Sequence, residues 1–163
     1  MRSLNLARAA AVTAASTALI LGGVSAASAA TASSGVAPRA TGATLTSASI
    51  TFFTLDDNKD SDTLLTIQVR TGGGTIAASK TGFFGQFGDG STTTIPLSLR
   101  AGITWDALQT GNVKLNIQPN GDDTWKFGYE LDLNFSDGDF VPTVESRLSL
   151  SEDNKIFTDP LQF

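Results

Sequence analysis

The segment "TWKFGYELDLNF", residues 124–135, alternates apolar and polar positions more regularly than any other part of the chain. The apolar positions share one face of an extended chain: Trp125, Phe127, Tyr129, Leu131, Leu133 and Phe135. A helix would scatter these side chains around its axis, so the pattern predicts a β-strand with one buried and one solvated face. Such strands are typical of antiparallel sheets. Because a strand of about twelve residues is long, we expect a bend or bulge near Gly128.

Shorter stretches with the same alternation predict further strands. The stretches are Leu45 to Leu55, Leu64 to Arg70, Thr75 to Lys80, Thr93 to Leu99, Asn112 to Gln118, Val144 to Leu150 and Lys155 to Thr158. Their inward positions include Leu65, Ile67 and Val69, then Ile95, Leu97 and Leu99, then Val113, Leu115 and Ile117. Turns rich in Gly, Asn and Asp separate the stretches, and "ITWDALQTG" from Ile103 predicts one helical turn. About eight strands in one domain predict an all-β fold, an antiparallel β-sandwich.

The N-terminal part of the chain differs from this body in composition. Residues 1–29 resemble a secretory signal peptide, with Arg2 and Arg8 before an apolar stretch and a small-residue triplet ending at Ala29. The apolar stretch has no basic stop-transfer flank, so we expect no transmembrane segment. Residues 30–43 are small, polar residues that predict a disordered spacer before the domain at 44–163. The mature protein is therefore expected to be secreted and extracellular, and the Ala-rich leader resembles those of high-GC Gram-positive bacteria.

The composition excludes several classes of function. The chain has no histidine, which removes the commonest zinc ligand and the usual general base of serine hydrolases. It has no cysteine, so no disulfide holds the secreted domain. The formal charge of −5 repels nucleic acid, so we expect no nucleic-acid partner.

The turn after the first predicted strand is crowded with acidic residues. Its sequence, "LDDNKDSDTL" at residues 55–64, places Asp56, Asn58, Asp60 and Asp62 at alternate positions. A tight turn brings alternate side chains to one side, and calcium takes about six to eight oxygen ligands. The glycine and glutamate that an EF-hand loop requires are missing, so the pattern predicts a calcium site of another kind.

Strand parity brings further acidic residues to the same place. If every strand crosses the sandwich once, alternate connections lie at the same end. Asp122 and Asp123 would then lie close to the first loop, and Asp89, Glu152 and Asp153 would lie beside them. The predicted metal ligands are Asp56, Asn58, Asp60, Asp62, Asp122 and Asp123.

A second interpretation of the acidic loop needs no metal. In it the carboxylates point apart into water, cap turns and keep the protein soluble. Two carboxylates about 6 Å apart repel by about 0.7 kcal/mol in water and about 3 kcal/mol at an effective dielectric of about 20. A crowded loop without a countercharge would therefore be costly.

Three motifs carry a family resemblance: "DDNKDSDT", the tight "TGGG", and "DTWKFGYELDLNFSDG". Together they resemble PLAT, or lipoxygenase-homology, domains and related calcium-dependent lipid-binding sandwiches, over nearly all of residues 44–163. The resemblance implies a non-enzymatic module that binds calcium in apical loops and attaches to lipid or protein. Asp56, Asp60 and Asp62 match the calcium loop by type, and Asp122 and Asp123 match a second apical loop. The loop tips carry few bulky residues, which argues against membrane insertion.

The aromatic residues leave a second class of function open. Trp105 lies in a connection, and "TGFFGQFGDG" places Phe84 and Phe87 among glycines. These are candidate ligand-binding residues. In a carbohydrate-binding module with a structural calcium, Trp105 or exposed phenylalanines meet a polysaccharide, whereas in a calcium-dependent module the phenylalanine loop forms an apolar tip that touches lipid or a partner. The other interpretation is that two of the loop phenylalanines fold back onto the core. Because so short a chain leaves little room for a substrate cleft, we expect no enzyme activity.

Overall fold

The computed structural model describes residues 42–163. The predicted signal peptide and most of the predicted spacer lie outside these residues. Ala43, the last residue of that spacer, is buried in the core, and its carbonyl accepts a hydrogen bond of 2.8 Å from the Trp105 N–H. The ordered domain therefore includes Ala43. Within the described residues, no helix is long and apolar enough to cross a membrane.

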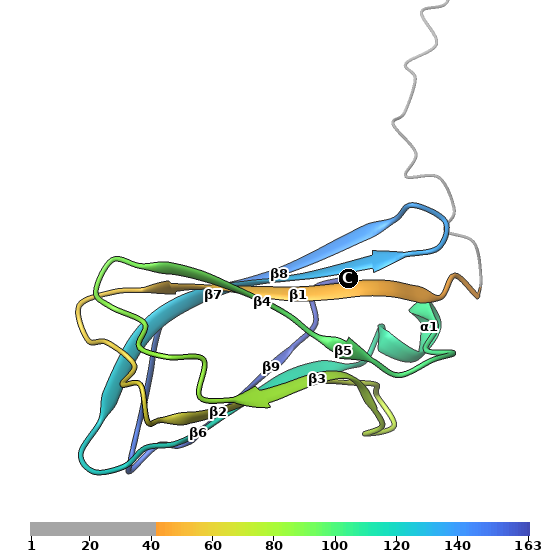
Figure 1. Ribbon diagram of the computed structural model, residues 1–163. Coiled ribbons are helices and arrows are strands. Elements are labelled where there is room, and N and C mark those ends of the chain that lie inside the picture. The colour runs from red at the N-terminus through yellow and green to blue at the C-terminus, as the bar shows by residue number, and fades with distance from the viewer. Residues whose placement is uncertain (1–41) are drawn as a thin grey trace, which may run out of the picture. The chain divides into compact units, whose positions relative to one another are not determined.

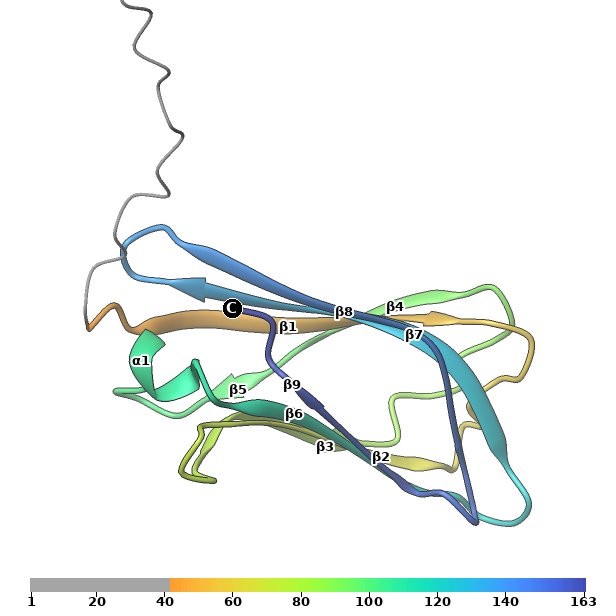
Figure 2. The same cartoon turned by 180° about the vertical axis from the view of Figure 1, so that it is seen from behind.

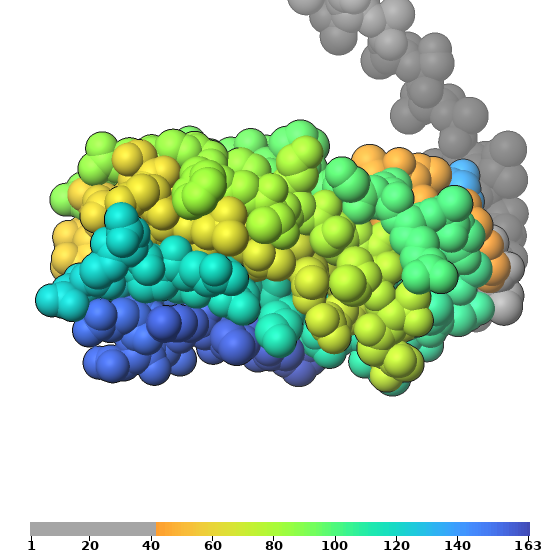
Figure 3. All heavy atoms as spheres, turned by 60° about the horizontal axis from the view of Figure 1, so that its bottom comes forward, coloured from red at the N-terminus to blue at the C-terminus, as the bar shows by residue number. Residues whose placement is uncertain are grey.

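Two antiparallel sheets lie face to face (Figure 1). The four-stranded sheet has the order β4-β1-β7-β8, with β4 at Thr92–Pro96, β1 at Leu45–Thr54, β7 at Thr124–Phe135 and β8 at Phe140–Ser151. The five-stranded sheet has the order β5-β3-β2-β6-β9, with β5 at Ser98–Leu99, β3 at Ile76–Gly82, β2 at Leu64–Arg70, β6 at Asn112–Gln118 and β9 at Ile156–Pro160. Figure 3 faces this second sheet, where the yellow, teal and blue bands of β2, β6 and β9 lie side by side. The predicted β-sandwich is confirmed.

The long strand β7 lies at the centre of the four-stranded sheet, between β1 and β8. All six apolar residues of its predicted inward face are buried. The pairing of β7 with β8 shifts between Phe127 and Tyr129, which confirms the irregularity expected at Gly128. A Cβ at Gly128 would lie 2.9 Å from the Glu145 carbonyl oxygen, so the close approach of β8 requires glycine there.

The predicted strand Thr93 to Leu99 is wrong as a single element. Its first part is β4 in one sheet, and after Pro96 the chain crosses to β5 in the other sheet. Proline lacks the N–H that a continuous ladder needs, which favours a break at this position. Leu97 stays buried at the crossover, but Leu99 is exposed rather than inward, because the alternation starts again in the new sheet.

β8 begins earlier than predicted, at Phe140 instead of Val144. Phe140, Pro142 and Val144 are apolar but face outward, whereas Val141 and Thr143 face the core. The segment therefore lacks the apolar–polar alternation on which the prediction depended.

The helical turn predicted in the Ile103 segment is confirmed as α1, Trp105–Leu108. After β9 the chain crosses to the four-stranded sheet (Figure 2), where the Gln162 N–H donates a hydrogen bond of 3.1 Å to the Thr143 hydroxyl. Phe163 packs edge-on against Trp105, with ring centroids 4.5 Å apart. These contacts close the sandwich near α1.

Candidate functional site at the acidic end

Four loops meet at the end of the sandwich opposite α1 (Figure 1). They are residues 55–63, 83–91, 119–123 and 152–155, and Figure 3 shows their colours together at its left end. We call this region the acidic end. Its carboxylates are Asp56, Asp57, Asp60, Asp62, Asp89, Asp122, Asp123, Glu152 and Asp153. The structure thus brings together the loops that strand parity placed at one end.

Side-chain hydrogen bonds join the first loop to the 119–123 loop. The carboxylate of Asp123 accepts hydrogen bonds from the Thr63 hydroxyl and, at 3.5 Å, from the Asp60 N–H. The amide of Asn120 donates to the Asp62 carboxylate at 2.9 Å. Three of the predicted ligands, Asp60, Asp62 and Asp123, therefore take part in the hydrogen bonds between these two loops, and the carboxylates of Asp62 and Asp123 each accept from a protein donor.

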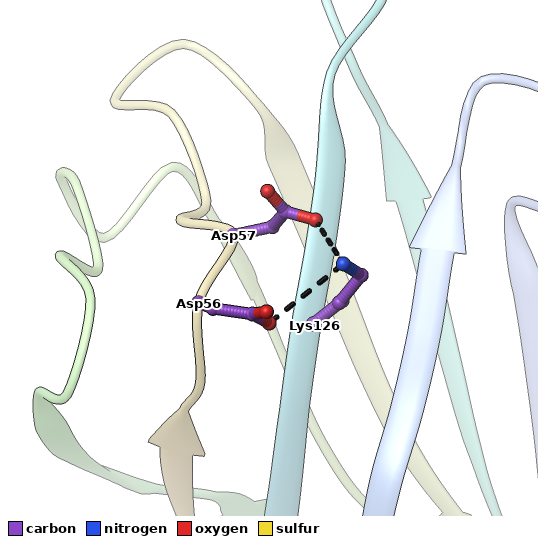
Figure 4. Close-up of polar contacts among 3 residues, drawn as sticks. All are labelled: Asp56, Asp57 and Lys126. Atoms are coloured by element: carbon purple, nitrogen blue, oxygen red, sulfur yellow. Dashed lines mark ion pairs between the residues drawn. The ribbon is translucent and has the colours of Figure 1, made fainter.

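Asp56 and its neighbour Asp57 share a different countercharge, the ammonium of Lys126 at the start of β7. The Lys126 Nζ lies 2.7 Å from a carboxylate oxygen of Asp57 and 3.7 Å from one of Asp56, as Figure 4 shows. The hydrogen bond to Asp57 and the charges of both aspartates raise the pKa of Lys126. All three side chains are substantially exposed, so the ion pairs contribute little stability.

The remaining predicted carboxylate, Asp122, pairs with an acidic neighbour. A hydrogen bond with Asp122, together with its negative charge, raises the pKa of Glu152 above the ordinary value. Both residues are exposed. A raised pKa between two carboxyls indicates like charges that lie close together.

The strongest countercharge at the acidic end is Lys59, from the middle of "DDNKDSD". Its side chain is 0% exposed. The ammonium donates to the carbonyl oxygens of Asp60 at 2.8 Å, Thr63 at 3.2 Å, Phe83 at 2.7 Å and Gly85 at 2.8 Å. Burial lowers the pKa of Lys59, and the negative charges of Asp123, Asp60 and Asp62 oppose that shift.

Backbone hydrogen bonds at Lys59 join the 55–63 loop to the 83–91 loop. The Phe87 N–H donates to the Lys59 carbonyl at 2.9 Å, and the Lys59 N–H donates to the Phe87 carbonyl at 3.2 Å. The Phe87 ring lies under the ammonium, with its centroid 4.8 Å from Nζ. The same ring packs in the core against Phe52 and Trp125, at centroid distances of 6.1 and 5.6 Å. The Phe87 ring therefore contacts both the Lys59 ammonium of the acidic end and the aromatic rings of the core.

These contacts distribute the six predicted calcium ligands over separate partners. Asp56 pairs with Lys126, and Asp122 interacts with Glu152. Asp60, Asp62 and Asp123 take part in the hydrogen bonds between the first loop and the 119–123 loop. Asn58 is half-buried in the first loop. Among residues 42–163 there is no group of three or more acidic side chains placed to hold a metal ion. The six residues do not share one set of partners, and calcium binding at this end stays a prediction.

The candidate ligand-binding aromatics do not lie where a sugar could stack on them. Trp105 is 4% exposed and packs against Phe135, and Phe87 is 1% exposed. Phe84 is half-buried and packs on the core, so two loop phenylalanines fold back as the second interpretation expected. The exposed phenylalanine of this loop is Phe83, which is not among the predicted ligand-binding residues.

Lys59 is the other residue that sequence reasoning missed. The one available signal is its position, a single base among aspartates in a turn. A surface lysine in an acidic loop has the same local sequence, so burial could not be inferred from it.

A scan against protein-family models finds no match for the chain, and a search of curated protein sequences finds none either. The resemblance to PLAT domains therefore stays a prediction that rests on short motifs.

Proposed function

We propose that this protein is a secreted, non-catalytic binding module that holds a partner protein at its acidic end. The observation that carries the proposal is the mixed character of this surface. The loops that display the carboxylates also display Leu55, 41% exposed, and Phe83, 53% exposed. Apolar anchors surrounded by charged groups are typical of protein–protein interfaces.

The charge of the acidic end selects the chemistry of the partner. Asp60, Asp62, Asp122 and Glu152 are all exposed there. A partner with basic side chains around an apolar contact area complements this surface, and the long-range attraction accelerates association. A nucleic acid or a bare anionic membrane would be repelled.

The absence of histidine and cysteine from the sequence supports a non-catalytic role. The commonest general base and the most nucleophilic side chain are both missing. The secreted location rests on the signal-peptide pattern of residues 1–29.

Calcium-bridged binding of an anionic partner, including a lipid headgroup, is the second candidate. Asp122 and Glu152, two exposed carboxylates from different loops of the acidic end, support it, because the hydrogen bond with Asp122 and its negative charge raise the pKa of Glu152. A divalent cation at that pair would relieve their repulsion, and extracellular sites of this kind are weak, with dissociation constants of about 10⁻⁴ to 10⁻³ M.

The carbohydrate alternative loses Trp105 as a sugar contact, because Trp105 belongs to the core. Replacement of Trp105 by alanine would remove a buried ring, so loss of polysaccharide retention in that variant would report unfolding as readily as a lost sugar contact.

Site-specific photocrosslinking tests the proposed surface. A photoreactive amino acid replaces Phe83 at the acidic end or, as the control, Ile76, which is exposed at the start of β3. Each protein is added to the cells that secrete it. We expect a crosslinked partner from position 83 and none from position 76. Crosslinking from position 76 alone would overturn the assignment.

The identified partner is then titrated against charge variants. The double variant Asp60→Asn/Asp62→Asn is expected to weaken binding by about tenfold and to reduce its salt dependence. Asp137→Asn, in the exposed loop between β7 and β8, is the matched control and should bind as the wild type does. Equal affinities for all variants would refute direct contact. If the partner does not bind in chelator and binds again when calcium is added, the calcium-bridged candidate replaces direct contact between the partner and the carboxylates.

A further inference from the structure

The ammonium of Lys59 lies in a cage of oxygen atoms. Four carbonyl oxygens surround it at 2.7 to 3.2 Å, two from the first loop and two from the loop after β3. An ammonium group has three N–H donors, so four acceptors exceed its capacity and one N–H is shared. A cage with more acceptors than donors is typical of oxygen sites that hold a cation by its charge.

The cage is built from backbone and is closed to solvent. Lys59 is completely buried, and the Phe87 ring covers one side of the ammonium. Two residues that supply or adjoin the oxygens have positive φ angles, Phe84 at 58° and Gly85 at 76°. Positive φ is costly for a residue with a side chain, so the turn that aims the Phe83 and Gly85 carbonyls at Nζ is held by the surrounding structure.

We propose that the Lys59 ammonium is the resident cation of the acidic end. It occupies an oxygen cage of the kind that holds a metal ion, and it locks the 55–63 loop to the 83–91 loop without any divalent cation. This covalently attached positive charge lies among the crowded aspartates of the 55–63 loop. The assignment does not depend on the partner of the protein.

The position of the cage also explains how the acidic end remains ordered. Asp60 and Thr63 each supply a carbonyl to the ammonium and also take part in the Asp123 network. The cation therefore supports both the first loop and its junction with the 119–123 loop. Without it, four backbone carbonyls, of which the Thr63 carbonyl is in a buried hydrogen bond, would lose a charged donor, which is more costly than the loss of a surface ion pair.

Hydrogen exchange on the wild-type protein gives the first test. The Phe87 amide, which donates to the Lys59 carbonyl, and the Thr63 amide, which donates to the Asp60 carbonyl at 3.3 Å, report the order of the two loops. We expect the protection of both amides to be the same in chelator, magnesium and calcium. An ammonium signal of Lys59 that exchanges slowly with water is expected in all three conditions. Protection that appears with calcium alone would overturn the proposal.

Substitution of Lys59 gives the second test, with Lys126 as the matched control. Lys59→Met keeps an unbranched side chain one atom shorter and removes the charge, and we expect the protection of both amides to fall by about tenfold or more. Lys126→Met removes the same charge from the same end and should leave both amides protected. If Lys59→Met matches Lys126→Met, the cage does not hold the loops.

A third variant covers the case in which Lys59→Met does not fold. Lys59→Ala leaves the cage with room for a small cation, and ammonium, methylammonium or potassium ions at high concentration should restore the protection of the Phe87 amide. Tetramethylammonium is too large for the cage and serves as the control for ionic strength. Equal recovery in every salt, or no recovery in any, would contradict a cation cage.

Discussion

Tyr129 shows how one buried polar residue joins the two sheets. It lies on the inward face of β7, and its hydroxyl donates a hydrogen bond of 2.9 Å to the Asp159 carboxylate on β9. Burial is the main cause of the raised pKa of Tyr129, and the hydrogen bond and the charge of Asp159 add to it. Sequence alternation placed the ring inside, but the partner lies thirty residues away on another sheet.

Alkaline titration tests this arrangement, because Tyr129 is the one tyrosine of the chain. Its pKa in the folded state lies above the ordinary value of 10.0, so the unfolded state releases this proton first and stability falls as pH rises above about 10. We expect tyrosinate absorbance to appear together with unfolding and not before it. Tyr129→Phe should lose stability less steeply over the same range. Tyrosinate formed near pH 10 in a protein that remains folded would contradict the assignment.

The pair β7 and β8 shows what an element requires beyond its hydrophobic pattern. Across from Gly128 the β8 backbone bulges between Glu145 and Leu148, and Arg147 adopts a φ of 60°. The sequence predicted an irregularity from the length of β7 and the position of Gly128. It did not predict that the extra residue belongs to β8, because register depends on the partner strand.

Gly128→Ala tests the close approach at the bulge. The added Cβ would lie 2.9 Å from the Glu145 carbonyl oxygen and 3.3 Å from the Ser146 Cα, both backbone atoms, so β8 must shift. We expect a loss of about 1 to 3 kcal/mol in the free energy of unfolding, measured by urea denaturation. Gly73→Ala is the control, because its Cβ would meet one atom at an ordinary 3.8 Å, and its stability should change by less than about 0.5 kcal/mol. If Gly128→Ala and Gly73→Ala had the same free energy of unfolding, β8 would move away from β7 without an energetic cost.

The whole molecule gathers its charge unevenly. Four loops bring nine carboxylates to one end, and the nearby positive charges are Lys59 inside the end, Lys126 at its edge and Lys155 in the last of the loops. This distribution arises from strand topology, since alternate connections of a sandwich lie at the same end. It gives the domain one strongly acidic surface, where we propose that a partner binds.

Thermal unfolding in calcium, magnesium and chelator tests how this charge is balanced. If Lys59 is the resident cation, the three midpoints should agree within experimental error. A calcium-selective rise that Asp122→Asn abolishes would establish the calcium-bridged candidate at the Asp122–Glu152 pair. A rise that Asp60→Ala abolishes would instead restore the predicted shell, because ligand binding to the folded state raises the midpoint by mass action.

The sequence alone determined the elements whose burial follows from local alternation. β2, β6 and β7 begin and end at their predicted residues, because an inward apolar face shows its period in the sequence. The same argument fails for β8, where outward apolar residues hide the period, and at Pro96, where the chain changes sheets.

The tertiary structure alone decided which groups meet at the acidic end. The sequence showed aspartates in separate loops, and strand parity was enough to bring those loops together. Whether a charge among them faces water or lies in the interior depends on loops distant in sequence, since the Phe83 and Gly85 carbonyls that receive Lys59 come from the connection after β3. Local sequence records the charge of a side chain, but its solvation is set by the whole fold.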